Sequence, residues 1–554
     1  MSVVEEVQND LKEALQEAVL KSDELDLDSV PTIELEVPRE EEHGDYATNL
    51  AMVLSGQASM APRQIAEIIT TDLDLDIIDD LEVAGPGFIN FHLNNNWLYR
   101  VIEKISQAGG EYGQTDLGAG QKVQIEFVSA NPTGPLHVGH SRGAVVGDVL
   151  AEIMETAGFD VSREYYINDA GNQLEILGKS VAIRYQQLFG ADVELPEDAY
   201  HGDYIEEIAQ EIAAEDDKQH LADAEAGEVD YFREFAYQKM LENIRRDLND
   251  FGIEFDNWFS ERSLHPDAIE EVIAELKEQD LVYEEEDALW FKSTDFGDDK
   301  DRVVVKSDGS YTYLAPDIAY HKDKYERGFE QAINVWGADH HGYIARVEAV
   351  VEALGYGKDW LEVILVQLVN LLRDGETVAM SKRAGDFVTL RDVVDEVGVD
   401  AARYFYVMRD TDSHLDFDLE LAKEESKDNP VYYIQYAHAR ICSIEEQLKD
   451  EDYQIPNCDE VDLSELRADS ELELIKKLAQ YPAEVAQSAS SKEPHHIARY
   501  AYELATLFHK FYNKCRVLGE NEAVSKARIT LVEAVKQVLL NVLAILGISA
   551  PESM

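Results

Sequence analysis

The chain has 554 residues, enough for three or four domains that each bury a core of their own. Its 113 acidic and 48 basic residues give a formal net charge of −65, while a hydrophobic content of 45% excludes a disordered chain. Three scattered cysteines exclude a disulfide framework, predict no zinc site and favour a reducing cytoplasm. We expect no membrane association, because no segment approaches the roughly 18 consecutive apolar residues of a spanning helix. The acidic, amphipathic start of the chain does not read as a signal peptide.

The excess of acidic residues predicts a protein adapted to molar salt. A folded chain with this charge repels itself unless counterions screen it. At 1 M salt the Debye length is about 3 Å, so repulsion acts only near contact. We therefore expect a halophilic source.

In chain order, the pattern predicts three units. Residues 1–105 mix helical and strand segments and form an α+β unit, which a glycine-rich linker joins to the next. Residues 119–410 alternate strands and helices and predict a Rossmann-type α/β domain, interrupted near 190–230 by a very acidic, helical insertion with a solvated face. Residues 425–554 are almost wholly helical, and Pro430 suits a first helical turn. The predicted fold is α/β and multidomain, with an all-α C-terminal domain.

The segment "SANPTGPLHVGHSRG" lies where a strand gives way to a helix. Val123 to Val128 read as a buried strand, the Asn, Pro and Gly residues that follow break it, and a helical pattern then runs to a capping glycine at Gly158. The free N–H groups at the start of such a helix favour a phosphate. His137 and His140 stand at this helix start.

Three interpretations of the histidine pair remain open. It could bind a metal, although no suitably spaced third ligand follows. One histidine could cap its own loop. The pair could also neutralise charge on a nucleotide triphosphate, with Gly139 between them letting the nucleotide approach the backbone.

"HVGH" resembles the first signature of class I aminoacyl-tRNA synthetases, and "AMSKRAG" far downstream resembles the second. The resemblance implies catalytic roles for His137, His140 and Lys382. It also implies an ATP-binding set that the two signatures supply together: His137, Gly139, His140, Met380, Ser381, Lys382 and Arg383. The first lysine of the second signature is replaced by Ala379, which leaves open whether Arg383 shares the role of Lys382.

Charged residues near the first signature suggest the amino acid. Glu126 lies in the strand, and Tyr313 and Asp317 are four apart at a predicted helix start. Two carboxylates and a tyrosine in one pocket suit the planar, five-donor guanidinium of arginine.

Several longer segments, among them "YYINDAGNQ", "YLAPDIAYH" and "YIQYAHARI", are similar to arginyl-tRNA synthetases in the same order along nearly the whole chain. The resemblance implies that Asn131 holds the α-amino or carboxylate group of arginine and that Glu126, Tyr313 and Asp317 hold its side chain. It places the turn of Asp339, His340 and His341 beside the substrate or nucleotide.

The same resemblance implies tRNA contacts in both outer units. Phe88 and Asn90 are candidates for the tRNA elbow, and Tyr432 and Tyr436 for stacking on anticodon bases. Ordinary strand packing and ordinary helix packing are the respective alternatives.

The activity that the resemblance implies is arginine–tRNA ligation: arginine attacks ATP to give arginyl-adenylate, which then passes to the 3′ end of tRNA(Arg). ATP with Mg²⁺ on its phosphates, arginine and tRNA(Arg) are the expected partners of a cytoplasmic monomer. Other class I synthetases (glutamyl, glutaminyl or lysyl), a tRNA-free nucleotidyltransferase and a non-catalytic regulator remain as alternatives.

Overall fold

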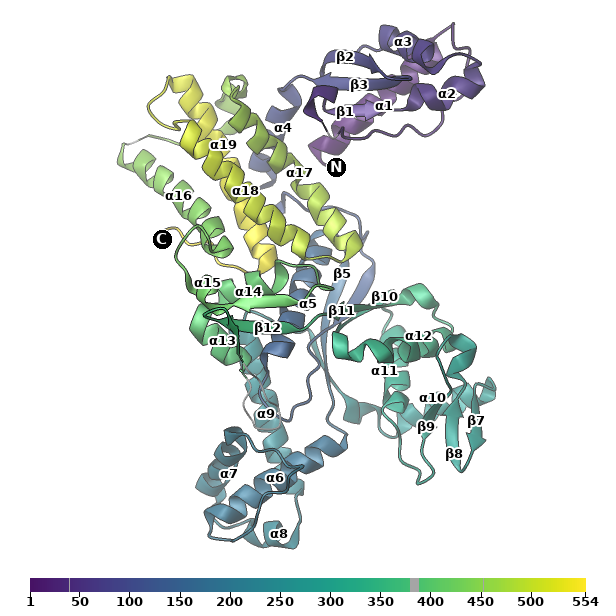
Figure 1. The fold of residues 1–554 in the computed structure, drawn as a ribbon, viewed down its shortest axis with the longest axis vertical. Coiled ribbons are helices and arrows are strands. Elements are labelled where there is room, and N and C mark those ends of the chain that lie inside the picture. The colour runs from purple at the N-terminus through teal and green to yellow at the C-terminus, as the bar shows by residue number, and fades with distance from the viewer. Residues whose placement is uncertain (39, 379–387, 452) are drawn as a thin grey trace.

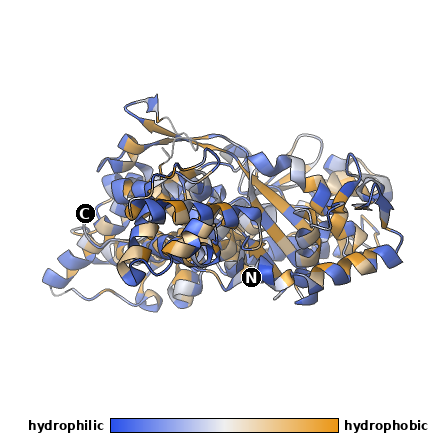
Figure 2. Ribbon diagram, turned by 90° about the horizontal axis from the view of Figure 1, so that it is seen from below, coloured by the Kyte–Doolittle hydropathy of each residue, from blue (hydrophilic) through white to orange (hydrophobic). Residues whose placement is uncertain are grey.

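The computed structural model describes residues 1–38, 40–378, 388–451 and 453–554. Figure 1 shows an elongated molecule, with a small N-terminal unit at one end, a helical insertion at the other and a parallel sheet near the middle. Hydropathy follows this arrangement, because the central strands are hydrophobic and the outer helix faces hydrophilic (Figure 2).

The N-terminal unit packs helices on a small antiparallel sheet of order β1-β3-β2. Helix α1 begins with a capping box in which Ser2 and Glu5 bond each other's backbone N–H, and it buries one face every three to four residues. The elements of this unit are α1 (Val3–Lys21), β1 (Tyr46–Thr48), α2 (Leu50–Ala58), α3 (Pro62–Asp72), β2 (Ile78–Ala84), β3 (Phe88–Leu93) and α4 (Asn96–Ala108).

The central unit is built on a five-stranded, wholly parallel sheet of order β11-β10-β4-β5-β6. Strand β4 comes first in the chain and pairs with β5 on one side and β10 on the other. Its strands and main helices are β4 (Lys122–Glu126), α5 (Val138–Thr156), β5 (Asp160–Ile167), β6 (Asn257–Ser260), α11 (Leu314–Glu326), β10 (Gln331–Gly337), α12 (Ile344–Ala353) and β11 (Leu361–Val366).

Helix α5 lies at the centre of the molecule and is buried nearly all round. The helix ends at Thr156 and Gly158 follows with a φ of +90°, so the predicted glycine cap is confirmed.

Two insertions interrupt the succession of strands in the parallel sheet. Between β5 and β6 the chain forms a helical insertion with its own apolar core: α6 (Asn172–Leu188), α7 (Asp203–Asp216), α8 (Leu221–Ala226) and α9 (Asp230–Asp250). It is helical as expected but extends beyond 190–230, because α6 and α9 pack with the acidic segment. Before α11 lies an antiparallel sheet with one helix: α10 (Asp267–Glu278), β7 (Val282–Glu285), β8 (Ala288–Phe291) and β9 (Arg302–Val305).

After the parallel sheet, a small unit combines a sheet of order β13-β12-β14 with three helices. Its elements are β12 (Val369–Arg373), β13 (Glu376–Thr377), α13 (Leu390–Val397), α14 (Val399–Val407), β14 (Leu415–Asp418) and α15 (Leu419–Lys423).

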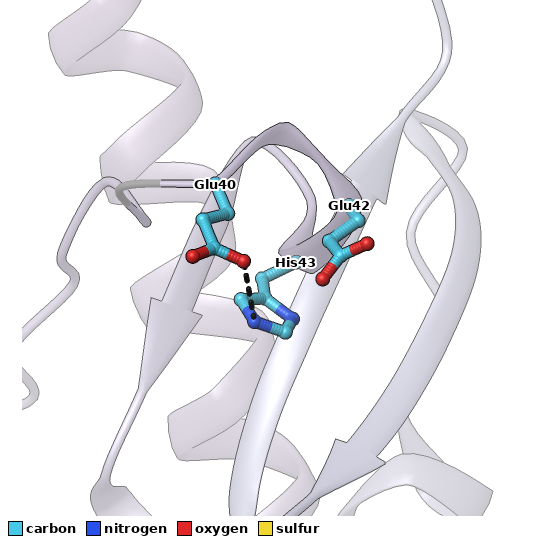
Figure 3. Close-up of side chains that lie close together, drawn as sticks. All are labelled: Glu40, Glu42 and His43. Atoms are coloured by element: carbon cyan, nitrogen blue, oxygen red, sulfur yellow. Dashed lines mark ion pairs between the residues drawn. The ribbon is translucent and has the colours of Figure 1, made fainter.

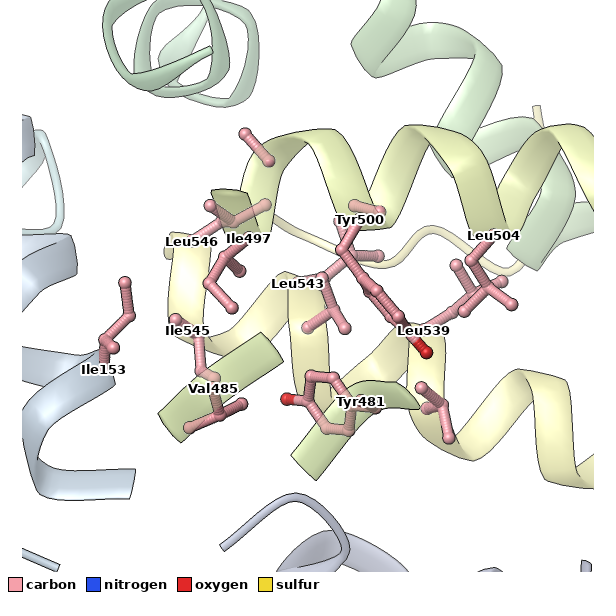
Figure 4. Packing of buried hydrophobic residues seen from close by; sticks show 14 of the residues in the cluster. Ile153, Tyr481, Val485, Ile497, Tyr500, Leu504, Leu539, Leu543, Ile545 and Leu546 are labelled. Atoms are coloured by element: carbon pink, nitrogen blue, oxygen red, sulfur yellow. The ribbon is translucent and has the colours of Figure 1, made fainter. Parts of the chain in front are cut away.

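The C-terminal unit is helical, as predicted: α16 (Pro430–Asp450), α17 (Asp469–Ser491), α18 (His495–Lys514) and α19 (Glu522–Leu546). Pro430 occupies the first turn of α16 after the cap Asn429. Helix α19 is long and apolar enough to span a membrane, but 67% of its most apolar window is buried in the protein. Figure 4 shows this core, in which Leu543 and Ile545 pack with Tyr481 and Val485, beside Ile153 of α5.

Candidate active site

The candidate site lies at the carboxyl ends of the central strands. From β4 the chain continues to one side through β5 and β6, and β10 and β11 lie on the other side. The boundary between β4 and β10 is therefore a topological switch point, where open α/β sheets bind ligands. The loop after β4 leads to His137, and the loop after β10 carries Asp339.

His137 and His140 are structural caps of α5. His137 is the N-cap residue, and its Nδ1 accepts the N–H of Gly139 at 3.0 Å, while His140 Nδ1 accepts the N–H of His137 at 3.3 Å. The rings stack with centroids 3.8 Å apart. Since Nδ1 accepts in both rings, the neutral imidazoles carry their proton on Nε2, which makes Nε2 a donor.

Gly139 is required by this cap. A Cβ at residue 139 would lie 2.8 Å from His137 Cε1 and 2.9 Å from its Nδ1. The sequence predicts that Gly139 lets the nucleotide approach the backbone. In the structure the space beside it is taken by the imidazole of His137.

The second signature lies outside the described residues, and so do its predicted ATP-binding residues Met380, Ser381, Lys382 and Arg383. The chain directly after it pairs with the first signature. Val138 donates its N–H to the carbonyl of Val388 at 3.1 Å, and Leu390 donates to Leu136 at 2.8 Å. The described residues that follow the second signature are therefore hydrogen-bonded to the chain at the N-terminal end of α5.

Carboxylates gather near Asp317 on the other side of the switch point. Asp317 is partly exposed in the first turn of α11, and the Tyr343 hydroxyl donates to it. Burial by the surrounding protein raises the pKa of Asp317 to about 7, and the charges of Glu261 and Glu126 add to the rise. Glu261 is buried and accepts from the Tyr166 hydroxyl at 2.9 Å. These carboxylates concentrate negative charge around Asp317, which suits a cation.

Glu126 is already engaged within the protein. Its Oε2 accepts from Lys324 Nζ at 2.7 Å and its Oε1 from the Ser129 hydroxyl at 2.9 Å. Lys324 is fully buried and also donates to Asn334 Oδ1 at 2.9 Å. Nearby, burial lowers the pKa of His321 to about 3, so this imidazole is neutral.

The other residues predicted to bind arginine, and the predicted substrate turn, are exposed. Tyr313 precedes α11 and is 63% exposed, so the tyrosine that contacts Asp317 through its side chain is Tyr343 rather than Tyr313. Asn131 is exposed in the loop after β4. Asp339, His340 and His341 are exposed on a short 3-10 helix that follows β10.

The sequence does not single out Tyr343, Glu261 or Arg142, which the structure places near the candidate site. Tyr343 stands two residues after the predicted turn of Asp339 to His341, and Arg142 belongs to "HSRG", so proximity to a motif was a signal for these two residues. Arg142 is fully buried, and among the described residues its guanidinium donates to five backbone carbonyls: those of Tyr406, Gln367, Ser413, Arg409 and Asp410. It fastens α5 to the small unit that follows the parallel sheet.

The candidate tRNA residues differ in accessibility. Asn90 is 4% exposed within β3, where it stands opposite Ala47 and Glu82, and Phe88 is partly buried. Burial of Asn90 favours the strand-packing alternative.

Tyr432 and Tyr436 are partly exposed on α16, with stacked rings 6.2 Å apart. Arg440 donates to the Tyr436 hydroxyl at 2.9 Å and lies over the rings of Tyr436 and Tyr512. This group presents aromatic faces and one cation to solvent.

Among the described residues, one group of three potential metal ligands has its ligand atoms within 4.8 Å of one another: Glu40, Glu42 and His43 (Figure 3). All three are exposed in the N-terminal unit, away from the switch point. Exposed carboxylates on a chain this acidic do not by themselves make a metal site.

The parallel sheet, the histidine-capped helix and the helical C-terminal unit together define a class I aminoacyl-tRNA synthetase. Three family models match in succession: the arginyl tRNA synthetase N-terminal domain over residues 5–93, the class I (R) tRNA synthetase catalytic domain over 101–426 and the DALR anticodon binding domain over 434–554. The chain belongs to the arginyl-tRNA synthetase family, and it is an enzyme, an arginine–tRNA ligase.

Relatives match along the whole length. The arginine–tRNA ligases of Desulforamulus reducens and Bacillus subtilis are 52% and 49% identical, each over 100% of both chains. A solved Campylobacter jejuni structure assigned as an arginyl-tRNA synthetase is 37% identical with a TM-score of 0.77, covering 83% of this chain and 100% of that one. The family assignment excludes the other class I enzymes considered above.

Proposed function

We propose that this enzyme activates arginine with ATP at the switch point between β4 and β10 and passes it to the 3′ end of tRNA(Arg). The observation that carries the proposal is the placement of two complementary features beside the switch point. The N-terminal end of α5 favours a phosphate, and the carboxylates around Asp317 favour a guanidinium.

In the activation step, His137 and His140 donate from Nε2 to triphosphate oxygens as these gain charge. Their Nδ1 atoms are held by the helix cap, so the rings are oriented before the substrate arrives. Lys382 and the neighbouring Met380, Ser381 and Arg383 complete the ATP site. The residues at the helix mouth offer nitrogen donors, which suit phosphates, and Mg²⁺, which prefers oxygen ligands, is carried by the ATP itself.

In the arginine site, Asp317 and Glu126 face the guanidinium, with Tyr313 at the rim and Asn131 on the α-amino or carboxylate group. Asp339 to His341 border the same site. Glu261 and Tyr343 join this set, since Tyr343 orients Asp317 and Glu261 adds a buried negative charge.

We propose the division of labour predicted above: an elbow-binding unit at 1–105, a catalytic domain at 119–410 and an anticodon-binding domain at 425–554. Tyr432 and Tyr436 stack on anticodon bases, supported by Arg440 at their side. Phe88 is the better of the two elbow candidates because Asn90 is buried. The enzyme is a monomer of a salt-rich cytoplasm.

The test is to charge total tRNA in molar KCl with each amino acid in turn. We expect charging with arginine alone. We also expect arginine-dependent pyrophosphate exchange only when tRNA is present, as the family resemblance implies. Robust exchange without tRNA would contradict that part, and charging with another amino acid would contradict the assignment of the carboxylates around Asp317.

A further inference from the structure

The helical insertion α6–α9 has no part in the proposed function, yet one of its side chains reaches the site. Tyr204 stands in the first turn of α7, and its hydroxyl donates to the backbone carbonyl of Thr133 at 2.9 Å. Thr133 belongs to the loop between β4 and α5 and is 9% exposed. The contact therefore joins the insertion to the segment that precedes His137.

Two glycines leave room for the Tyr204 ring. A Cβ on Gly134, in the loop, would lie 3.1 Å from the Tyr204 hydroxyl oxygen. A Cβ on Gly202, in the insertion, would lie 2.4 Å from the ring carbon Cε1. The loop and the insertion are thus both shaped around this side chain.

The same loop begins with strained backbone. Val128 and Ser129 have φ angles of +67° and +40°, in the left-handed region that non-glycine residues rarely adopt. A β-branched residue is especially unfavourable there. Each such residue costs on the order of 1–3 kcal/mol, so the conformation persists only where surrounding groups hold it.

Within the described residues, three hydrogen bonds from β5 and the insertion hold residues 129–133 of this loop. The N–H of Tyr166 donates to the Ser129 hydroxyl at 3.1 Å, and the Tyr165 hydroxyl donates to the Ala130 carbonyl at 2.7 Å. Both tyrosines belong to β5 and are part of the sheet. The third bond, to Thr133, comes from Tyr204 and depends on the insertion.

We propose that Tyr204 is a positioning residue through which the acidic insertion holds the loop between β4 and α5 in its strained, active conformation. The proposal rests on the proposed function, because that loop carries Asn131 and leads into His137. Burial raises the pKa of the Tyr204 phenol, so the hydroxyl remains a donor throughout the working pH range.

The experiment compares Tyr204→Phe with Tyr231→Phe in the full chain. Tyr204→Phe keeps the ring between the two glycines and removes only the hydroxyl. Tyr231→Phe makes the same change in the same insertion, where the hydroxyl donates to Asp216 at 2.6 Å and does not touch the loop. We expect Tyr204→Phe to lower kcat for arginine charging about five- to tenfold, as the loss of one buried hydrogen bond implies. The KM for tRNA and the unfolding midpoint should match those of Tyr231→Phe.

Hydrogen exchange of the peptide covering residues 127–137 gives a readout that is independent of activity. Faster exchange in Tyr204→Phe than in Tyr231→Phe, together with the specific loss of kcat, supports the proposal. Equal kcat in the two variants overturns it, and so does an equal loss in both with equally lowered unfolding midpoints. If the wild type charges an amino acid other than arginine, the proposed function fails, while unchanged exchange in Tyr204→Phe still overturns the positioning role.

Discussion

At the scale of single residues, the proposed selectivity for arginine depends on the charge state of Asp317. Asp317 is partly exposed, and burial raises its pKa to about 7 when no ligand is bound. In the proposed site, a bound guanidinium would give this carboxylate a positive partner. In the ligand-free protein, the hydrogen bond from Tyr343 orients the Asp317 carboxylate.

Asp317→Asn should impair the use of arginine far more than stability. The loss of one partner of a buried ion pair costs about 3–5 kcal/mol, and we expect the lower end because Asp317 keeps some exposed surface. This corresponds to about a hundredfold loss in kcat/KM for arginine. Steady-state charging kinetics measure the loss. Asp323→Asn, on the same helix and paired with Arg327, is the matched control. Near-normal arginine kinetics in Asp317→Asn would show that this carboxylate is not in the pocket.

The arginine KM should also depend on pH. Arginine binds the ionised carboxylate, so it must displace the proton that Asp317 carries below its pKa of about 7. We therefore expect the KM for arginine to rise as pH falls below 7, approaching about tenfold per pH unit, and to level off above 8. Measuring KM between about pH 6 and pH 8.5 covers roughly one unit on each side of the pKa. A flat profile in the wild type would contradict it, and Asp317→Asn should lack the dependence.

At the scale of elements, α5 connects the parts of the site. Its first turn holds the histidine cap, and one turn later Arg142 fastens the small unit that includes β12, α13 and α14. Burial lowers the pKa of Arg142 to about 10, which still leaves the guanidinium charged. Further along, Asp148 pairs with the buried Arg403 of α14 at 2.5 Å. One helix thus orients both the histidine cap and the unit whose chain returns to it at Val388.

The second signature should contribute to chemistry rather than to binding. Lys382→Ala should lower kcat for adenylate formation by at least about tenfold, a loss of about 1.4 kcal/mol, because a charge on the transition-state phosphates is lost. Affinities for arginine and tRNA should barely change. Single-turnover adenylate formation in the presence of tRNA measures the effect. The paired variant is Arg383→Ala. A large loss there with none in Lys382→Ala would reassign the role to Arg383.

At the scale of the whole molecule, the net charge of −65 dominates. In dilute buffer, repulsion between the negative charges destabilises the folded chain and also repels RNA. At molar salt, screening reduces the range of both repulsions to about 3 Å. Binding of RNA then depends on local contacts of Lys and Arg with phosphate.

Activity and folding should therefore rise together with salt. We expect an unfolded or inactive enzyme at about 0.1 M KCl. Folding and charging activity should both recover towards about 1–3 M KCl, where the Debye length is about 3 Å or less. At the highest salt, charging should flatten, because counterion release favours RNA binding less. A titration of tRNA charging with circular dichroism on the same samples measures both. A folded, fully active enzyme at the lowest salt, declining steadily as salt increases, would refute the adaptation to salt.

Local chemistry along the chain determined much of the architecture. The strand before the first signature, the helix after it, its glycine cap at Gly158 and the start of α16 at Pro430 all follow from neighbouring residues, because turns, caps and periodicity act over a few positions. The order of recognisable segments was enough to indicate the family. The excess of acidic residues is likewise a property of composition alone.

Tertiary structure decided which distant groups meet. The hydroxyl of Tyr343, which follows β10, bonds Asp317 of α11, a contact that the sequence does not indicate. Arg142 finds its carbonyl partners more than 200 positions away, between Gln367 and Ser413. Tyr204 reaches Thr133 from an insertion 71 positions downstream. The physical reason is common to all three: a hydrogen bond between remote segments leaves no periodic pattern in the sequence, and only the packing of the chain brings donor and acceptor within reach.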